Sequence, residues 1–559
     1  MLEAIRSRQR LIELGDDALE DYQRTVLQAM IDNPKFALFL DTGLGKTAVC
    51  LRFIREMFDR DAIRKVLVIA PLKVANQTWP SEIPRWAFSN PLPFRMVRTP
   101  DLVEAVNGAG RAALNRTLTE KERVKVERAA LRMVKKERSR NPSLTEEELL
   151  PLMKQRAEKE YRAHTANLVK METANRLLLE REARDPAVIH IVNCEMVEWV
   201  VEAWGADWPY QCVIYDESDG IKDHTTKRWK ALRNVAPNCD YFYELTATPN
   251  AESYLGLWAQ MFLLDGGKRL GRTFTEYKER YFDENRYSHK ITLRKGSEER
   301  IAAKLADITL EMKQQDYLKD VAPYRIQNVL YELPEHAIEL YKQMDKNGVA
   351  EIGDKTIYAD QAVSVLQKLL QISAGFIYDT EDTLDNFGAA VEKRNIYPIH
   401  DAKIEKLKEL QELHKGEPLL VSYVHQGSLE KLCKHFPEAI VMDRKGTQRK
   451  AWNDGKIKML LMHPKSGAHG LNLQFGGHIV INYDVHYSYG QFYQFLRRLA
   501  RRGQPAAEVL VYNLLGAGTY DIAVEKACWQ EKRSMQEAFF DLIKRFRKHG
   551  KNKAKRSRD

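Results

Sequence analysis

Short apolar segments alternate with helical segments along two parts of the chain. In the first part, KFALFLD, KVLVIAP, VIHIVN, CVIYDE and YFYELTATP each have the pattern of a buried strand that ends in a turn or in polar residues. A second set, PLLVSYV, AIVMD, KMLLMH, GHIVINYD and EVLVYNLL, follows late in the chain. Strands that are separated by helices form parallel βαβ units, with binding sites at the carboxyl ends of the strands. The pattern therefore predicts an α/β protein with two doubly wound, parallel-sheet lobes.

A charged helical segment interrupts the first set of strands. Residues 111–185 are rich in Arg, Lys, Glu, Leu and Ala, and apolar positions such as Val124, Leu131 and Val134 recur among the charges at helical spacing. A break at Asn141-Pro142-Ser143 predicts two long helices hinged at the proline. The segment is either a solvated hairpin without a ligand or a contact for nucleic acid or a protein partner. The pattern does not decide between the two.

The length and the charge distribution refine this picture. A chain of 559 residues exceeds the ~250–300 residues that one hydrophobic core supports, so two large domains are expected. The net charge of +10 is concentrated in two places: residues 544–559 hold nine basic and one acidic side chain, and residues 111–185 hold 19 basic and 13 acidic ones. The rest has 60 basic and 64 acidic side chains. Nucleic-acid binding by the body of the protein would therefore depend on a few placed contacts and not on overall charge.

Cysteine spacing and hydropathy exclude several classes of protein. The six cysteines lie far apart and form no CxxC pair, so neither a zinc site nor a disulfide framework is expected. No stretch approaches the ~18–20 consecutive apolar residues of a membrane helix. The start, MLEAIRSRQRLIEL, is charged throughout and lacks the apolar core of a signal peptide. We expect a cytoplasmic protein that makes no membrane contact.

The segment LFLDTGLGKTAVCL has the features of a phosphate-binding loop. An apolar strand runs into a glycine-rich turn, which is followed by a helix. Glycines let backbone N–H groups wrap a phosphate, Lys46 can reach the β- and γ-phosphates, and Thr47 can ligate Mg²⁺. Leu40 stands where the strict GxxxxGK[ST] pattern has its first glycine. The candidate nucleotide-binding residues here are Thr42, Gly43, Leu44, Gly45, Lys46 and Thr47.

Two further strands end in candidate chemistry. QCVIYDESD ends in Asp216-Glu217, which would supply one carboxylate for the metal and a second to orient or activate water. Asp-Glu after a strand is often only a solvated strand end, but its position in the same lobe as the phosphate loop favours the catalytic interpretation. In YELTATPN, Thr246 and Thr248 would either hydrogen-bond the acidic pair or cap the turn before Pro249.

The late segment QFYQFLRRLARRGQ supplies candidate arginines. On a helix, Gln494, Arg498 and Arg501 fall on one face, at i, i+4 and i+7. Arginines from a facing lobe can neutralise the charge that develops in phosphoryl transfer. Arg497 and Arg502 lie off this face and are not assigned to catalysis. The arginine cluster could instead contact a phosphate backbone.

With these blocks in this order, the chain resembles the superfamily 2 nucleic-acid-dependent ATPases, specifically their Swi/Snf-type branch of duplex-DNA translocases. The resemblance covers nearly the whole chain outside residues 111–185 and the basic tail. Its most diagnostic parts are LWAQMFLLDGG with FTEYKERYF, which generic helicases lack, and Gln494 to Gln504, which fit a Q-x3-R-x2-R-x-G-Q signature. The compact form, and HPKSGAHGLNLQ in particular, is most similar to phage and bacterial members.

The resemblance also implies roles for individual residues. Tyr22 and Gln23 look like the adenine-reading block, and the block from Pro71 to Val74, which includes Lys73, looks like the one that touches a DNA strand. Two departures stand out: Asp219 ends the acidic box where relatives mostly carry His or another residue, and the 111–185 insertion falls at an unusual place. Residues that the resemblance assigns to nucleic-acid contact or coupling are Pro71, Lys73, Thr246, Thr248, Ser466, Gly467 and Asn472.

The resemblance implies two RecA-like lobes with a helical insertion in lobe 1. The expected segments are 1–110, the first part of lobe 1 with ATP binding; 111–185, the charged insertion; 186–300, the second part of lobe 1 with a helical protrusion; 301–400, the linker and the protrusion of lobe 2; 401–535, lobe 2; and 536–559, a C-terminal helix and basic tail.

The implied activity is that of an ATP-driven motor. ATP and Mg²⁺ would bind between the lobes, where Lys46, Asp216, Glu217, Gln494, Arg498 and Arg501 would carry catalysis, with Thr47 and Asp216 on the metal. The implied partner is double-stranded DNA, with RNA as the alternative and a protein partner at the insertion. A strand-separating or branch-migrating helicase is a rival hypothesis, and a non-catalytic nucleic-acid-binding scaffold is a third.

Overall fold

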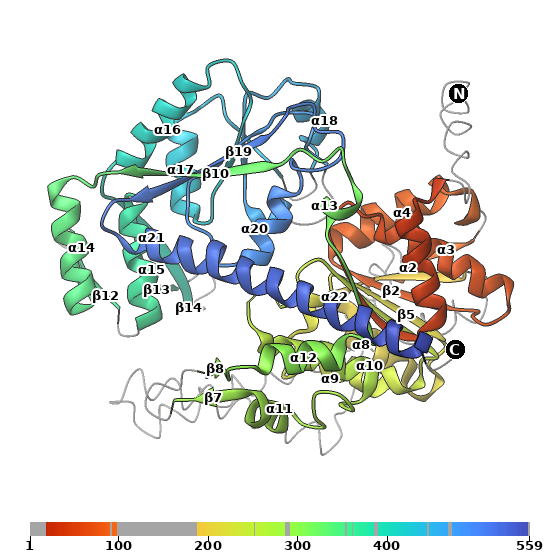
Figure 1. Cartoon of the computed structure of the whole chain (residues 1–559). Helices are drawn as coiled ribbons and strands as arrows, with labels where there is room; N and C mark the ends of the chain where they lie inside the picture. Colours follow the sequence, from red (N-terminus) through yellow and green to blue (C-terminus); the bar gives the residue numbers. More distant parts are fainter. Residues whose placement is uncertain are drawn as a thin grey trace, which may run out of the picture. The chain divides into compact units, whose positions relative to one another are not determined.

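The computed structural model describes residues 18–89, 92–97, 187–250, 252–285, 291–352, 355–359, 362–384, 390–443, 446–467 and 472–556 (Figure 1). The insertion expected at 111–185, with its hinge at Pro142, lies outside the described residues. Within the described residues, helices and strands alternate along the chain, as the hydrophobic pattern predicts.

A seven-stranded sheet contains all five strands of the first predicted set. Its order is β3 (Phe94–Met96), β4 (Ile189–Asn193), β2 (Val66–Ala70), β5 (Cys212–Asp216), β6 (Tyr241–Thr246), β1 (Lys35–Leu40) and β9 (Thr309–Met312). The pairs β2–β4, β3–β4 and β1–β9 are parallel. Strands β2 and β5 are buried along their whole length, as expected for a parallel sheet with both faces covered.

A six-stranded sheet contains the second set. Its order is β10 (Tyr324–Tyr331), β19 (Val509–Gly516), β18 (Ile479–Asn482), β15 (Leu419–Ser422), β17 (Met459–Met462) and β16 (Ile440–Val441). Every pairing in it is parallel. The α/β class with two doubly wound parallel sheets is therefore confirmed. Strands β9 and β10 were not predicted; they lie in the stretch that the hydrophobic pattern assigned to a linker.

The chain divides into two compact units. Among the described residues, the first comprises 54–89, 92–97, 187–214 and 225–242, and the second comprises 18–53, 215–224 and the described residues from 243 to 556. The first unit contains β2, β3 and β4 with helices α8 (Val197–Trp204) and α9 (Lys227–Val235). The second contains β1, β9 and the whole six-stranded sheet. The candidate residues at 41–47, 216–219, 246–248 and 494–501 all belong to this second unit.

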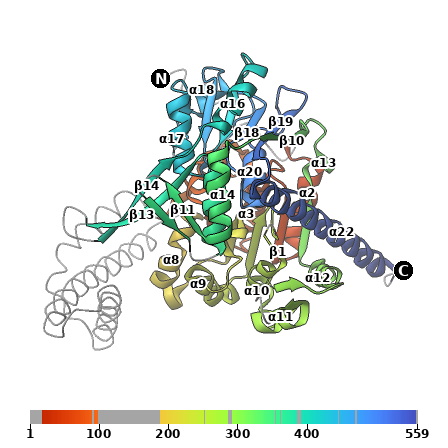
Figure 2. The same ribbon diagram turned by 90° about the vertical axis from the view of Figure 1, so that its left-hand side faces the viewer.

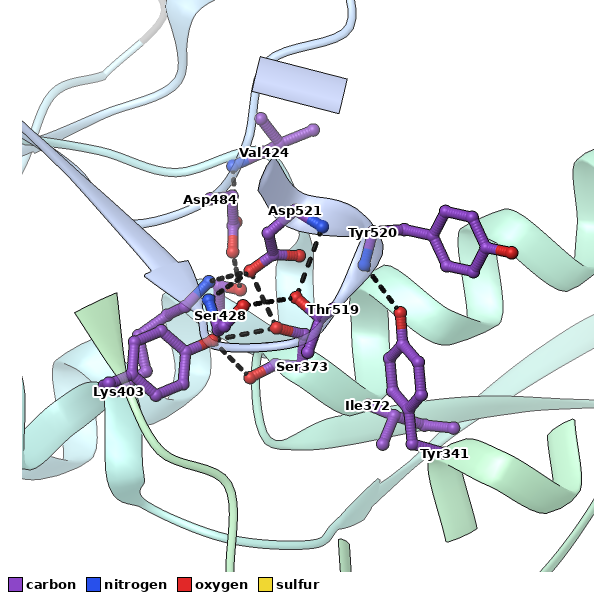
Figure 3. Close-up of polar contacts among 12 residues, drawn as sticks. Tyr341, Ile372, Ser373, Lys403, Val424, Ser428, Asp484, Thr519, Tyr520 and Asp521 are labelled. Atoms are coloured by element: carbon purple, nitrogen blue, oxygen red, sulfur yellow. Dashed lines mark hydrogen bonds and ion pairs between the residues drawn. The ribbon is translucent and has the colours of Figure 1, made fainter. Parts of the chain in front are cut away.

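A buried polar cluster fixes the helices around the six-stranded sheet (Figure 3). Asp521, on α21 (Tyr520–Glu525), accepts hydrogen bonds from Ser373 Oγ at 2.7 Å and from the backbone N–H of Gly516 at 3.0 Å. Lys403, on α16 (Ala402–Leu413), lies 3.7 Å from the same carboxylate, and both side chains are almost fully buried. The pairing compensates the cost of burying the two charges. The cluster joins α15 (Ala362–Ser373), α16 and α21.

The described part of the chain ends in a long helix, α22 (Lys532–Arg556), of 25 residues (Figure 2). Its apolar side packs beneath the phosphate-loop strand, with the Phe540 ring stacked 6.5 Å from that of Phe39. Lys544 pairs with Asp316 at 2.8 Å, and Arg547 donates to the carbonyl of Thr309. Two cations of the basic tail, Lys544 and Arg547, are thus bound to the rest of the protein. No helix among the described residues has the length and apolarity needed to cross a membrane.

Candidate nucleotide-binding and catalytic site

The phosphate-loop sequence forms a loop between β1 and α3 (Lys46–Asp59). Gly43 and Gly45 have φ angles of +84° and +72°, in the left-handed region that favours glycine. A Cβ atom at Gly45 would lie 2.1 Å from Gln23 Nε2, and one at Gly43 would lie 2.9 Å from Gln314 Nε2. Lys46 Nζ donates to the carbonyl of Leu40 at 2.8 Å. Conformation and space therefore both require the two glycines, as a loop that wraps phosphate with its backbone N–H groups does.

The expected adenine-reading residues lie beside this loop. Glu20 is the N-cap of α2 (Asp21–Asp32), and Gln23 closes a capping box by accepting from the N–H of Glu20 at 2.9 Å. The amide nitrogen of Gln23 donates to the carbonyl of Leu44 at 3.2 Å. The ring of Tyr22 lies 5.2 Å from that of Tyr317, and burial, with Glu20, raises the pKa of Tyr22. Gln23 thus ties α2 to the phosphate loop.

The acidic box follows β5 directly. Asp216 is buried at the end of the strand, and Glu217 has a φ of +58°, an uncommon conformation for a residue other than glycine. Such backbone outliers cluster at functional sites. Burial raises the pKa of the Cys50 thiol, with Asp216 raising it further and Lys46 lowering it. Strands β1 and β5 belong to one sheet, and the phosphate loop and the acidic box follow the carboxyl ends of these two strands.

Asp219, which departs from the residue mostly found in relatives, ends the acidic box. Burial and then the charge of Glu217 raise its pKa to about 7, against the opposing charge of Lys222. It lines a cavity of about 250 Å³ together with Lys222, Thr248 and Glu252. The charge of Asp219 therefore changes near neutral pH.

The coupling block follows β6. Thr246 and Thr248 are fully buried, and Thr246 Oγ1 accepts from the N–H of Thr248 at 3.1 Å, so this hydroxyl caps the turn before Pro249. Gln260, on α10 (Leu257–Asp265), links the two blocks: its side chain accepts from Ser218 Oγ at 3.2 Å and donates to the carbonyl of Pro249 at 2.9 Å. The connection through Gln260 was not predicted, because an amide inside an apolar helix gives no signal of its partners.

The arginine segment differs from the single helix face that we predicted. Helix α20 (Tyr489–Leu496) ends at Leu496, and the chain continues in tight turns, with the N–H of Arg498 donating to Phe495 O at 3.0 Å. The prediction that Gln494, Arg498 and Arg501 share one helix face is therefore wrong. The turns nevertheless keep Gln494 and Arg498 close to the acidic box.

Gln494 and Arg498 both act on Glu217. Gln494 Nε2 donates to Glu217 Oε2 at 3.0 Å, and both side chains are buried. Burial and then the charge of Arg501 lower the pKa of Arg498 to about 10, against the opposing charge of Glu217. Burial lowers the pKa of Arg501 too, and its guanidinium donates to Asn472 Oδ1. Two cations are thus held close together beside one buried carboxylate, an arrangement that binding of an anion would relieve.

Arg497 has a role that the sequence did not suggest. Its guanidinium lies 3.8 Å from Asp41, at the start of the phosphate loop, and stacks over the rings of Tyr324 and Tyr493. Asp41 also accepts from Tyr493 OH at 2.5 Å and from the N–H of Gln314 at 3.1 Å. Asp41 follows a strand, which could have marked it as a candidate; nothing in the sequence pairs it with Arg497. Arg502 forms an exposed pair with Glu20 at 3.2 Å.

The residues expected to contact nucleic acid lie in both units. In the first unit, Pro71 and Lys73 follow β2, and Lys73 is the N-cap of η2 (Val74–Thr78). In the second, Ser466 and Gly467 end α19 (Pro464–Gly467). The carbonyl of Asn472 accepts from Asn453 Nδ2 at 2.9 Å, and its side chain accepts from Arg501. Asn472 therefore connects this set to the arginine segment.

Mg²⁺ prefers oxygen ligands, and it usually keeps waters and substrate phosphates in its coordination shell. The Thr47 hydroxyl, at the start of α3, and the Asp216 carboxylate are the side chains expected to hold it. Among the described residues, no three His, Cys, Asp or Glu side chains form a group that could hold a metal by themselves. One hydroxyl and one carboxylate leave coordination positions for phosphate oxygens and waters, so this donor set fits a metal that arrives with a nucleotide.

Comparison with known proteins places the chain in a family. The model of the SNF2-related domain matches residues 22–374. Protein p41 of Acyrthosiphon pisum secondary endosymbiont phage 1 is 27% identical over 540 residues, covering 94% of this chain and 98% of that protein. Protein CHROMATIN REMODELING 19 of Arabidopsis thaliana is 27% identical over 160 residues, which are 27% of this chain and 19% of that protein.

Two solved structures are also similar over most of their length. The Sulfolobus solfataricus SWI2/SNF2 ATPase core in complex with dsDNA is 17% identical, with a TM-score of 0.37, over 93% of this chain and 92% of that one. The core domain from the same organism is 16% identical, with a TM-score of 0.36, over 92% and 90%. The family rests on the domain match, which spans more than half of the chain: the protein belongs to the SNF2-related family of ATPases.

Proposed function

We propose that this protein is an ATP-dependent DNA motor, which hydrolyses ATP between two RecA-like lobes and translocates on double-stranded DNA to remodel it or to displace bound proteins. Family membership supports the use of ATP and DNA. The observation that carries the proposal is the hydrogen bond of 3.0 Å from Gln494 to Glu217. It joins the helix that follows β18 to the acidic box that follows β5, and so connects the two sheets at the residues that would act on ATP.

Each catalytic role follows from the chemistry of the side chain. Lys46 would bind the β- and γ-phosphates once its ammonium leaves the carbonyl of Leu40. Mg²⁺, held by Thr47 and Asp216, would neutralise charge on the phosphates when bound. Glu217 would orient the attacking water. Arg498 and Arg501 would stabilise the charge of the transferred phosphoryl group.

Coupling to DNA would run from the arginines to the nucleic-acid-contacting residues. Asn472 accepts a hydrogen bond from Arg501, so a shift of Arg501 on nucleotide binding would move Asn472. Contacts to phosphates and not to bases would suit movement along any DNA sequence. The residues that would make these contacts are Pro71, Lys73, Ser466, Gly467 and Asn472.

Two experiments test this function. Lys46→Ala should abolish ATP hydrolysis in the presence of duplex DNA, because the ammonium that binds the phosphates is lost; full activity of this variant would refute the site.

Translocation should displace a triplex-forming strand from an intact duplex. Unwound forks without triplex displacement would favour a strand-separating helicase, and stimulation by RNA alone would make RNA the substrate.

A further inference from the structure

Gln314 lies at the edge of the sheet where the phosphate loop begins. Strands β1 and β9 are parallel neighbours, with Leu40 paired to Met312, so the chain leaves both strands at the same edge. The phosphate loop leaves β1 there, and Gln314 leaves β9 two residues beyond the last pair. Ligands of doubly wound sheets bind beyond the carboxyl ends of the strands. The topology therefore places the side chain of Gln314 where a nucleotide would bind.

The side chain of Gln314 is buried, and the described residues offer its amide no hydrogen-bond partner. The residue is 1% exposed, and within this part of the chain neither its amide oxygen nor its amide nitrogen forms a hydrogen bond. Its backbone groups are bonded: the N–H donates to Asp41, and the carbonyl accepts from the N–H of Leu318. Burying an amide in this way is unfavourable, and an apolar side chain of the same shape would avoid the cost. Packing therefore does not explain why an amide stands here.

The amide nitrogen of Gln314 points at the phosphate loop. A Cβ atom added to Gly43 would lie 2.9 Å from Gln314 Nε2, so the amide occupies the space left open by the first glycine of the loop. One residue earlier, the hydroxyl of Thr42 is also buried, with no hydrogen-bond partner in the part of the chain that the structure describes. An amide NH₂ is a donor, and phosphate oxygens are acceptors only.

We propose that Gln314 is a nucleotide-binding residue that donates a hydrogen bond from Nε2 to the phosphate chain held by residues 42–47. The inference rests on the proposed function, because it requires that the loop bind a nucleoside triphosphate. The ligand then supplies the acceptor that the described residues do not. It also gives β9, which the hydrophobic pattern did not predict, a part in the site.

The test uses three variants of the full-length protein. Gln314→Met keeps the size of the side chain and removes the amide, and Gln314→Glu replaces the donor by an anionic acceptor. Gln315→Met makes the same change at the exposed neighbouring residue and serves as the control. Isothermal titration calorimetry gives the Kd of MgATP and of inorganic tripolyphosphate, and thermal unfolding without ligand gives Tm.

For Gln314→Met we expect both ligands to bind about 10-fold more weakly, with the Tm of the free protein unchanged or higher, because the lost amide had no partner. Gln314→Glu should bind both ligands more weakly still, and Gln315→Met should match the wild type. Binding by Gln314→Met within twofold of the wild type would overturn the inference. A loss confined to ATP, which would indicate a base contact, would overturn it too, as would a lowered Tm of the free variant. A wild-type protein that binds neither ligand would overturn the proposed function as well.

Discussion

Removal of the Gln494 amide should slow ATP hydrolysis without weakening ATP binding. In Gln494→Ala, Glu217 loses a hydrogen bond of 3.0 Å to a neutral donor. Gln494 is 2% exposed and Glu217 is 9% exposed, so water does not readily replace the donor. A hydrogen bond to a charged group contributes about 1.5–3 kcal/mol. If Glu217 orients the attacking water only in the transition state, this loss appears as a decrease in kcat of about 10- to 100-fold.

Steady-state phosphate release with saturating duplex DNA measures this effect. The variant should lower kcat and kcat/KM by the same factor, with KM for ATP changed less than twofold. Gln491→Ala, which removes an amide of the same size from the preceding turn of α20, serves as the control and should keep the wild-type kcat. A Gln494→Ala protein with a wild-type kcat would refute the assignment, and a raised KM with an unchanged kcat would show that Gln494 contributes to binding instead.

Three more predictions follow from the described contacts. Asp41→Asn leaves Arg497 buried without its carboxylate and should lower the free energy of urea unfolding by about 3 kcal/mol. The control Asp59→Asn removes an exposed pair with Arg55 and should lower it by less than about 1 kcal/mol. Equal effects of the two changes would contradict this. The pKa of Asp219, raised to about 7 in the folded protein, means that the folded state keeps a proton on this carboxyl that the unfolded state loses. The Tm of the wild type should therefore fall between about pH 4 and pH 7 relative to the Tm of Asp219→Asn. Parallel profiles of Tm against pH for the two proteins would contradict this. Truncation after Arg547, which keeps the bound cations Lys544 and Arg547, should weaken DNA binding without lowering Tm. The slope of log K against log salt concentration should become less steep by up to about 0.9 for each lost phosphate contact. An unchanged slope would exclude the tail from DNA binding.

The hydrophobic pattern predicted the strands that are buried on both faces of a sheet. Strands of a parallel sheet buried on both faces are continuous apolar runs, so β1, β2 and β5 are evident from the sequence. The exposed residues of β10 and the short run of β9, which contains Glu311, break that rule. Local pattern therefore missed the two strands at the edges of the sheets.

The phosphate loop is recognisable in the sequence because its local pattern is specific. The glycines of the phosphate loop need left-handed backbone, and a Lys-Thr pair after them is recognisable from spacing alone. The contacts of Asp41 with Tyr493, Arg497 and Gln314 were not predicted, because these partners lie 452, 456 and 273 residues away in the sequence. The helix predicted through Arg501 ends at Leu496, since the backbone turns at Arg497 while its side chain packs on Tyr324 and Tyr493.

The central claim is that ATP hydrolysis at the Lys46 site depends on duplex DNA. The most direct measurement is the rate of phosphate release by the wild type and by Lys46→Ala, each with double-stranded DNA, with single-stranded DNA, with RNA and without nucleic acid. The account predicts the highest wild-type rate with double-stranded DNA and no hydrolysis by the variant with any of them. A wild-type rate that double-stranded DNA does not raise, or hydrolysis that persists in Lys46→Ala, would contradict it.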